Sequence, residues 1–210
     1  TVIVTIKDPS TPTTSSTNQN FCKINTPKIA DLKATASGTI IWYDQENGGT
    51  KYAASTPLVD GLQYYAANSD GTCESTNRLE VIVSLTDPEK PTGNSSQNFC
   101  SNPPPNPTIA NLEATASGTI IWYDQENGGN EYAAGTPLVN ETQYYAANSD
   151  GTCESSERLT VIVTIKDPST PTTNSTNQNF CKINTPKIAD LKATASGTII
   201  WYDQENGGTK

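Results

Sequence analysis

The sequence contains no histidine and no methionine among its 210 residues. Because histidine is the commonest general base and a frequent metal ligand, the usual catalytic and transition-metal sites are not expected. Basic residues are also scarce, with 13 Lys and Arg against 22 Asp and Glu, and the net charge of −9 argues against nucleic acid as a partner. No apolar run approaches the roughly 18 residues of a membrane-spanning helix, so we expect no direct membrane insertion.

What the sequence does contain is repetition. The motif SGTIIWYDQENGG occurs at residues 37–49, 117–129 and 196–208. Its tryptophans are 80 and 79 residues apart, and residues 1–51 equal residues 160–210 except that Ser15 corresponds to Asn174. Two alternating types of small domain, A and B, therefore form a higher repeat, and function is to be sought in the array.

Short alternating runs predict strands at Thr39–Asp44, Gln63–Asn68 and Arg78–Thr86. Ala30, Leu32 and Ala34 alternate with polar residues and predict a further half-buried strand. No run has the apolar periodicity of a helix. The pattern predicts an all-β chain of tandem immunoglobulin-like antiparallel β-sandwiches joined by Pro/Thr/Ser linkers.

The predicted division of the chain follows the repeats. It comprises the last strand of a preceding repeat (1–7), a linker (8–20), domain A (21–86), a linker (87–98), domain B (99–166), a linker (167–179) and the first half of a further A-type domain (180–210). The linkers are rich in Pro, Ser and Thr and are expected to be semi-extended spacers.

The predicted core is aromatic. Its candidate residues are Trp42, Tyr64, Trp122, Tyr144 and Trp201. Tyr64 has the spacing of a tyrosine corner, in which the phenolic hydroxyl bonds to the backbone of the turn before its strand. In domain B, Glu141 stands where domain A has Gly61, so the turn is expected not to depend on a positive φ. Trp201 is expected to lack a covering strand.

The cysteines fall one near each end of a domain. Their separations, 51 and 53 residues, suggest the disulfides Cys22–Cys73 and Cys100–Cys153, and the partner of Cys181 is expected beyond Lys210. The alternative is structural zinc, but no CxxC pair and no histidine are present to complete a ligand set. Disulfides indicate an oxidising compartment, hence an exported protein.

The acidic turns offer weak sites. Calcium could be bound by the carboxylates of the repeated YDQENGG turn, Asp44, Glu46, Asp124 and Glu126, although a solvated turn is the simpler interpretation. Asp70 and Glu74 have the form of a glycosidase carboxylate pair, but they flank a hairpin turn in every copy. No nucleotide-binding or hydrolase motif occurs. We therefore expect no enzyme, no cofactor and no metal.

Tyr43, Tyr65 and Ile41 are expected to face away from Trp42 and Tyr64. An outward aromatic patch could bind sugars, whereas burial by the fold itself is the simpler alternative.

Taken together, QNFC, PKIADLKATASG, IIWYD, TPLVDGLQYYAA and GTCES followed by RL and VIV resemble the immunoglobulin-like tandem repeats of giant cell-surface adhesins of Bacteroidota, the SprB-like gliding-motility adhesins. The resemblance covers both complete and both partial domains. It implies an array exported by type IX secretion and displayed on the bacterial cell surface, and it supplies no ligand-binding residue.

Two functions fit these observations. The first is a structural stalk or filament for surface attachment and gliding motility, whose partners are neighbouring repeats of the same chain. The second is a multivalent array that binds a glycan or surface polymer. Lateral self-association through edge strands is a further possibility.

Overall fold

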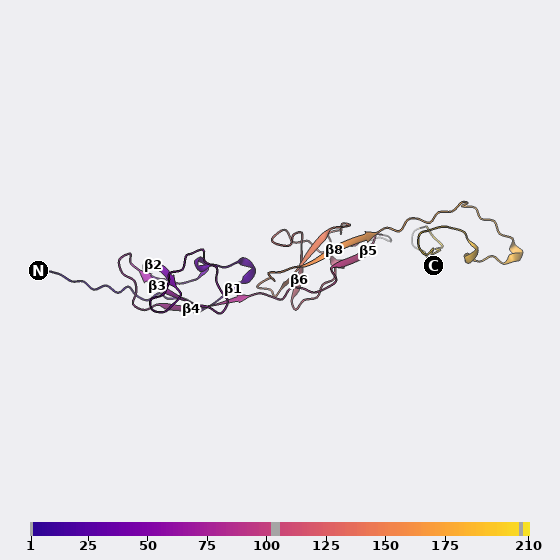
Figure 1. Cartoon of the computed structure of the whole chain (residues 1–210). Helices are drawn as coiled ribbons and strands as arrows, with labels where there is room; N and C mark the ends of the chain where they lie inside the picture. Colours follow the sequence, from indigo (N-terminus) through magenta and orange to yellow (C-terminus); the bar gives the residue numbers. More distant parts are fainter. Residues whose placement is uncertain (1, 102–105, 206–207) are drawn as a thin grey trace.

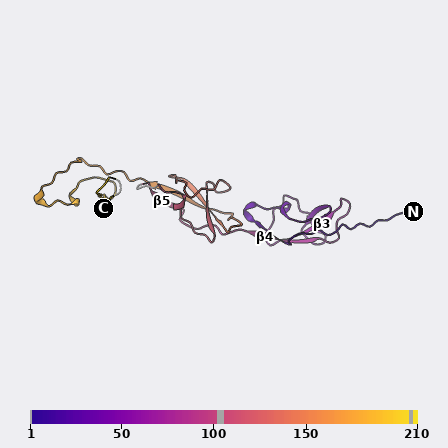
Figure 2. The ribbon, with the colours of Figure 1, turned by 180° about the vertical axis from the view of Figure 1, so that it is seen from behind.

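The computed structural model describes residues 2–101, 106–205 and 208–210. It contains two β domains that follow one another along an extended molecule (Figures 1 and 2). Domain A contains β1 (Asn18–Cys22), β2 (Thr39–Tyr43), β3 (Gln63–Ser69) and β4 (Leu79–Thr86). Domain B contains β5 (Ser96–Cys100), β6 (Thr119–Tyr123), β7 (Gln143–Ser149) and β8 (Leu159–Lys166).

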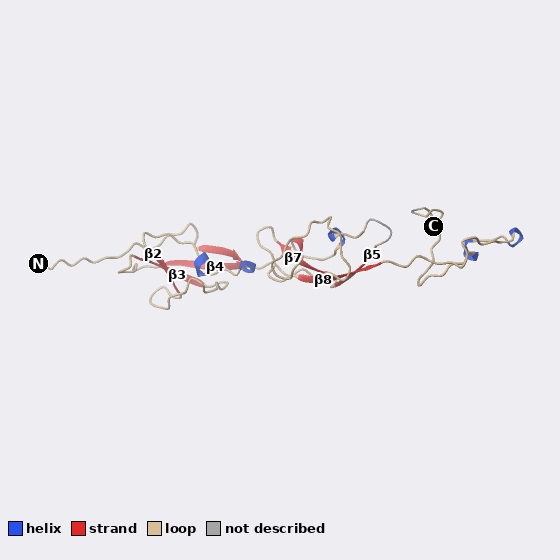
Figure 3. Ribbon diagram, turned by 90° about the horizontal axis from the view of Figure 1, so that it is seen from above, coloured by secondary structure: helices blue, strands red, loops and turns tan. Residues whose placement is uncertain are grey.

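Among the described residues, helix occurs as single 3-10 turns, drawn blue in Figure 3. These turns are η1 (Lys23–Asn25), η2 (Ile29–Asp31), η3 (Ile109–Asn111), η4 (Lys182–Asn184) and η5 (Ile188–Asp190). None of the helices in the described ranges has the length and apolar character needed to span a membrane.

Each domain has a four-stranded sheet, with the order β1-β4-β3-β2 in domain A and β5-β8-β7-β6 in domain B. The predicted strands of the three alternating runs are confirmed as β2, β3 and β4. The sheet is not purely antiparallel, because β1 runs parallel to β4 with Cys22 opposite Thr86. Loops and isolated bridges such as Lys28 with Pro57 form the opposing layer.

The core lies on one face of this sheet. In β4, Val81 and Val83 are fully buried, while Ile82 between them is 38% exposed, as strand alternation requires. Tyr64 and Trp42 pack in the same cluster as these valines. Domain B repeats the arrangement with Tyr144 and Trp122.

The tyrosine corner is confirmed in both domains. The hydroxyl of Tyr64 accepts a hydrogen bond from the backbone N–H of Val59 at 2.9 Å, and that of Tyr144 accepts one from Val139 at 2.8 Å. The expectation for the turn in domain B is wrong, because Glu141 has φ of 58°, close to the 72° of Gly61. The turn therefore requires a positive φ in both domains, and Glu141 adopts it at a cost that glycine avoids.

The strand predicted over residues 30–35 is also wrong. Residues 29–31 form η2, whose turn is held by a bond of 2.7 Å from the backbone N–H of Lys28 to the Asp31 carboxylate. Ile29 and Leu32, three residues apart, are the buried side chains. The sequence has both spacings, and the local capping interaction favours the turn.

The segments at both ends of the chain lack sheet partners. Val2, Ile3, Val4 and Ile6, which repeat the sequence of β8, are at least 79% exposed and form no strand. Residues 171–205 and 208–210 contain no counterpart of β3 or β4. Ile188 is consequently 63% exposed, whereas its equivalent Ile29 in domain A is 3% exposed. Trp201 is partly exposed.

Candidate functional site

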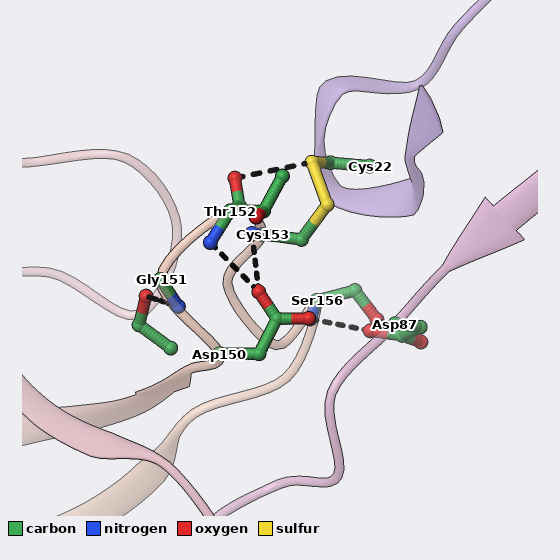
Figure 4. The surroundings of a disulfide bond; sticks show 8 residues. Cys22, Asp87, Asp150, Gly151, Thr152, Cys153 and Ser156 are labelled. Atoms are coloured by element: carbon green, nitrogen blue, oxygen red, sulfur yellow. Dashed lines mark hydrogen bonds between the residues drawn. A yellow bond between two sulfur atoms is a disulfide. The ribbon is translucent and has the colours of Figure 1, made fainter. Parts of the chain in front are cut away.

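The disulfide connects the two domains. Cys22 at the end of β1 is bonded to Cys153, which follows the hairpin after β7, with their Cα atoms 5.3 Å apart (Figure 4). This differs from the expected intradomain pairs Cys22–Cys73 and Cys100–Cys153. In the part of the chain that the structure describes, Cys73, Cys100 and Cys181 have no disulfide partner.

Strand β4 explains why an intradomain bond does not form. Cys22 lies opposite Thr86 at the last residue of β4, while Cys73 follows β3, whose Ala66 already lies opposite Leu79, the first residue of β4. Leu79 and Thr86 are seven residues apart along β4, which corresponds to about 23 Å at 3.3 Å per residue. A disulfide requires Cα atoms within about 7 Å, so the two cysteines of one domain cannot meet.

The hairpin of domain B holds Cys153 at the domain surface. The carboxylate of Asp150 accepts hydrogen bonds from the backbone N–H groups of Cys153 at 2.7 Å and Thr152 at 2.8 Å. Both bonds lower the pKa of Asp150, and the bond from Cys153 has the larger effect. Gly151 takes a φ of 92°, which a side chain would disfavour. Cys22 Sγ lies 3.5 Å from the carbonyl oxygen of Thr152, a contact without a donor since the sulfur carries no hydrogen.

Asp87 connects the same two surfaces a second time. It directly follows β4, and its carboxylate accepts hydrogen bonds from the backbone N–H of Ser156 at 2.8 Å and from the Ser156 hydroxyl at 2.9 Å. It also forms a 2.8 Å ion pair with Lys23 of domain A. Burial would raise the pKa of Asp87, but the bonds from Lys23 and Ser156 outweigh it and the pKa is lowered.

The expected linker 87–98 is not a spacer. The Asn148 side chain, in β7, donates a 2.9 Å hydrogen bond to the carbonyl of Glu89, and Pro91 is among the fully buried residues. Thr92 pairs with Thr115, and β5 begins at Ser96. Strand β4 is thus followed at once by residues bound to domain B. We call residues 87–98, together with Cys22, Cys153 and Ser156, the junction.

The expected linkers 8–20 and 167–179 are also paired rather than free. Thr13 pairs with Thr35, β1 begins at Asn18 and Thr172 pairs with Thr194. Proline and serine in these segments reflect an irregular first edge of the domain, with Pro12 buried. Their composition resembles that of a linker because few of their side chains enter the core.

Asp44 and Asp124, two of the candidate calcium ligands, accept hydrogen bonds from the backbone of their own turns. Asp44 accepts a 2.7 Å hydrogen bond from the backbone N–H of Thr50, and Asp124 accepts one of 2.7 Å from Asn130. Glu46 and Glu126 are exposed. Within the described ranges, no group of three or more His, Cys, Asp or Glu side chains is placed to hold a metal.

The carboxylates of Asp70 and Glu74 are occupied as well. Asp70 binds the backbone N–H groups of Thr72 and Cys73, just as Asp150 does in domain B. Glu74 accepts hydrogen bonds from the Tyr43 hydroxyl and from Lys51, and the bond from Lys51 is the main cause of its lowered pKa. Both carboxylates therefore organise the hairpin.

Of the expected aromatic patch, Tyr43 is covered by an arginine. The guanidinium of Arg78 lies 3.4 Å from the ring centre of Tyr43 and donates to the carbonyls of Gln45 and Gly48 at 2.6 and 2.7 Å. Tyr43 is consequently 5% exposed, while Tyr65 remains partly exposed. Arg158 occupies the same position in domain B and is 6% exposed. We did not predict a role for either arginine from the sequence. The available signal was that a single Arg directly precedes the last strand of each domain.

These features define a class: tandem immunoglobulin-like β domains connected end to end by a polar and covalent junction. The family model for the immunoglobulin-like domain described as CHU_C associated matches residues 9–86 and 88–166. The chain belongs to this family of immunoglobulin-like domains. The matches include residues 9–20 and 88–98, which belong to two of the three segments expected to be linkers. Domains of this fold are generally non-catalytic.

Solved structures of low similarity were also found. Human protocadherin-24 EC1-2 is 10% identical, with 78% of this chain and 100% of that chain covered and a TM-score of 0.29. The titin I-band fragment I67-I69 is 13% identical, with 67% and 60% covered and a TM-score of 0.26. The N-terminal four Ig domains of Dscam1 isoform 9.44 are 12% identical, with 79% and 49% covered and a TM-score of 0.24. At these TM-scores, the three structures establish nothing about the function of this chain. No curated protein matches this sequence.

Proposed function

We propose that the chain is a non-enzymatic structural segment of a long bacterial cell-surface adhesin, a stalk whose domains keep a fixed relation to one another. The family match supports repeated immunoglobulin-like domains, which are typical of extracellular adhesion and structural proteins. The disulfide fits an oxidising, extracellular location. A role in surface attachment and gliding motility, with export by type IX secretion, extends the resemblance noted in the sequence.

The single observation that carries this proposal is the junction. A flexible tether between domains would contain unbound residues, whereas here Asp87 follows β4 and already binds both Lys23 and Ser156. The Cys22–Cys153 bond adds a second covalent connection beside the chain itself. Two connections at separate points restrict bending and rotation of one domain against the other.

Small-angle X-ray scattering tests this rigidity. We expect the oxidised chain to give a narrow distance distribution at all concentrations, and a variant with Cys22→Ser and Asp87→Ala to give a broader one. The matched control is Asp167→Ala, which changes the equivalent Asp after β8 and should leave the distribution unchanged. An equally narrow distribution in the junction variant, or a broad one in the unaltered chain, would contradict the proposal.

Two further experiments address the cellular role. Antibodies to the chain should label intact, unpermeabilised cells of the bacterium that produces it, and loss of the protein should impair attachment and gliding. Binding of the purified chain to a glycan or surface polymer, abolished by Tyr65→Ala, would favour the alternative of a multivalent binding array. Sedimentation across a concentration series tests the proposed lateral self-association.

A further inference from the structure

Each domain contains two cysteines with different positions. Cys22 and Cys100 end the first strand of their domains, and Cys73 and Cys153 follow the hairpin after the third strand. The observed bond joins a cysteine of the first kind in domain A to one of the second kind in domain B. Domain A therefore retains a hairpin cysteine, and domain B a strand cysteine, with no partner in the described residues.

We infer that these two cysteines are the remaining halves of equivalent disulfides: Cys73 accepts the strand cysteine of a domain placed before domain A, and Cys100 accepts the hairpin cysteine of a domain placed after domain B. The partner in each case is another domain of this family. The inference rests on the proposed function and makes the junction a repeated covalent connection along the array.

The hairpin of domain A is already arranged as at the junction. The Asp8 carboxylate accepts a 2.9 Å hydrogen bond from the backbone N–H of Thr76, as Asp87 does from Ser156 at 2.8 Å. The Asn68 side chain donates to the carbonyl of Ser10 at 2.9 Å, the counterpart of the bond from Asn148 to Glu89. The residues that would connect to a preceding domain are thus bound beside Cys73.

Cys100 has the same position in domain B as Cys22 has in domain A. Cys100 lies opposite Lys166 at the end of β8, as Cys22 lies opposite Thr86. The backbone N–H of Ser101 donates to the carbonyl of Lys166 at 3.1 Å, which continues the pairing past the cysteine. Cys100 is exposed. Its own hairpin cysteine, Cys153, is out of reach for the same reason as in domain A.

The chemistry needs an oxidant. Two thiols lose two protons and two electrons to a low-molecular-weight disulfide such as oxidised glutathione, which becomes two glutathione thiols, and one S–S bond forms between the domains.

Successive bonds of this kind shorten the covalent path of the array. From Cys22 the path passes directly to Cys153 and then along 28 residues to Cys181, the next strand cysteine. About 28 residues, or roughly 100 Å when fully extended, would bear load for each pair of domains. Unfolding of the residues between Cys22 and Cys153 would add no length.

The test extends the chain with its own sequence. Because residues 160–210 repeat residues 1–51, a copy of residues 52–86 appended after Lys210 supplies the missing part of a third domain. The extended chain is oxidised in a glutathione redox buffer, and its disulfides are mapped by mass spectrometry without reduction. We expect the Cys22–Cys153 bond together with a bond from Cys100 to the appended copy of Cys73. In the unextended chain Cys100 should remain open to alkylation.

A second variant covers the case in which the third domain fails to fold. A copy of residues 87–159 placed before Thr1 completes a B-type domain in front of domain A, because residues 1–6 repeat residues 160–165. Here the copied Cys100 should bond to Cys73. The bond in either extended chain supports the inference. Cys73 and Cys100 free in both, or bonded within their own domains, would overturn it. Binding of the purified chain to a glycan or surface polymer would favour the alternative of a binding array without affecting this result.

Discussion

The disulfide between the domains should set the length to which the chain can be pulled. The chain is held by its two termini in a single-molecule force experiment, with Cys181→Ser in every variant to remove one exposed thiol. In the oxidised protein, force passes from Cys22 to Cys153 and bypasses 131 residues. At about 3.5 Å per residue, the fully unfolded chain should be shorter by roughly 460 Å than the reduced chain.

Matched variants separate this arrangement from the intradomain one. Replacing Cys73 and Cys100 by serine should preserve the full shortening, whereas Cys153→Ser should abolish it. Two intradomain bonds would instead bypass 51 and 53 residues. These loops would give a smaller difference, roughly 360 Å, that disappears in the Cys73/Cys100 variant. That outcome would refute the reasoning from strand β4.

The remaining predictions concern the domains themselves. Glu141→Gly should raise the stability of domain B by about 1 kcal/mol in urea denaturation, because glycine adopts the positive φ without strain. Gly61→Glu should lower the stability of domain A by a similar amount. A destabilising effect of Glu141→Gly would contradict this prediction. Tyr144→Phe should cost about 1–2 kcal/mol, because the backbone N–H of the preceding turn loses its acceptor; an unchanged denaturation midpoint would count against the tyrosine corner. Burial, followed by the hydrogen bond to Glu154, raises the pKa of Tyr123 from 10.0 to about 12. The stability that this shift contributes is complete below pH 10 and is lost as the pH rises through 12, so Tyr123→Phe should reduce the fall in stability over that interval, and an identical pH profile in the variant would argue against the shift.

Much of the domain was predictable because its signals are local. The alternation of Leu79, Val81 and Val83 predicts a strand with one buried face, and that is what β4 is. The tyrosine corner was predictable from a spacing of a few residues. The positive φ at Glu141 was missed, although the glycine at the equivalent position of domain A was a signal for it.

The junction was not predictable in the same way. Counting residues between cysteines treats each domain as closed, and only the register of β1 and β3 against β4 shows that Cys22 and Cys73 lie at opposite ends. The role of Asp87 depends on which loop of the next domain reaches it. Such contacts between domains leave no periodic pattern in the sequence.

Peptide mapping of the unaltered, unreduced chain tests the central claim most directly. No Lys or Arg lies between Cys100 and Cys153, so trypsin must be combined with a protease that cleaves after glutamate. We predict one cross-linked species that joins the peptide of Cys22 to that of Cys153, with Cys73 and Cys100 recovered as alkylated thiols. Cross-links from Cys22 to Cys73 and from Cys100 to Cys153 would contradict the account.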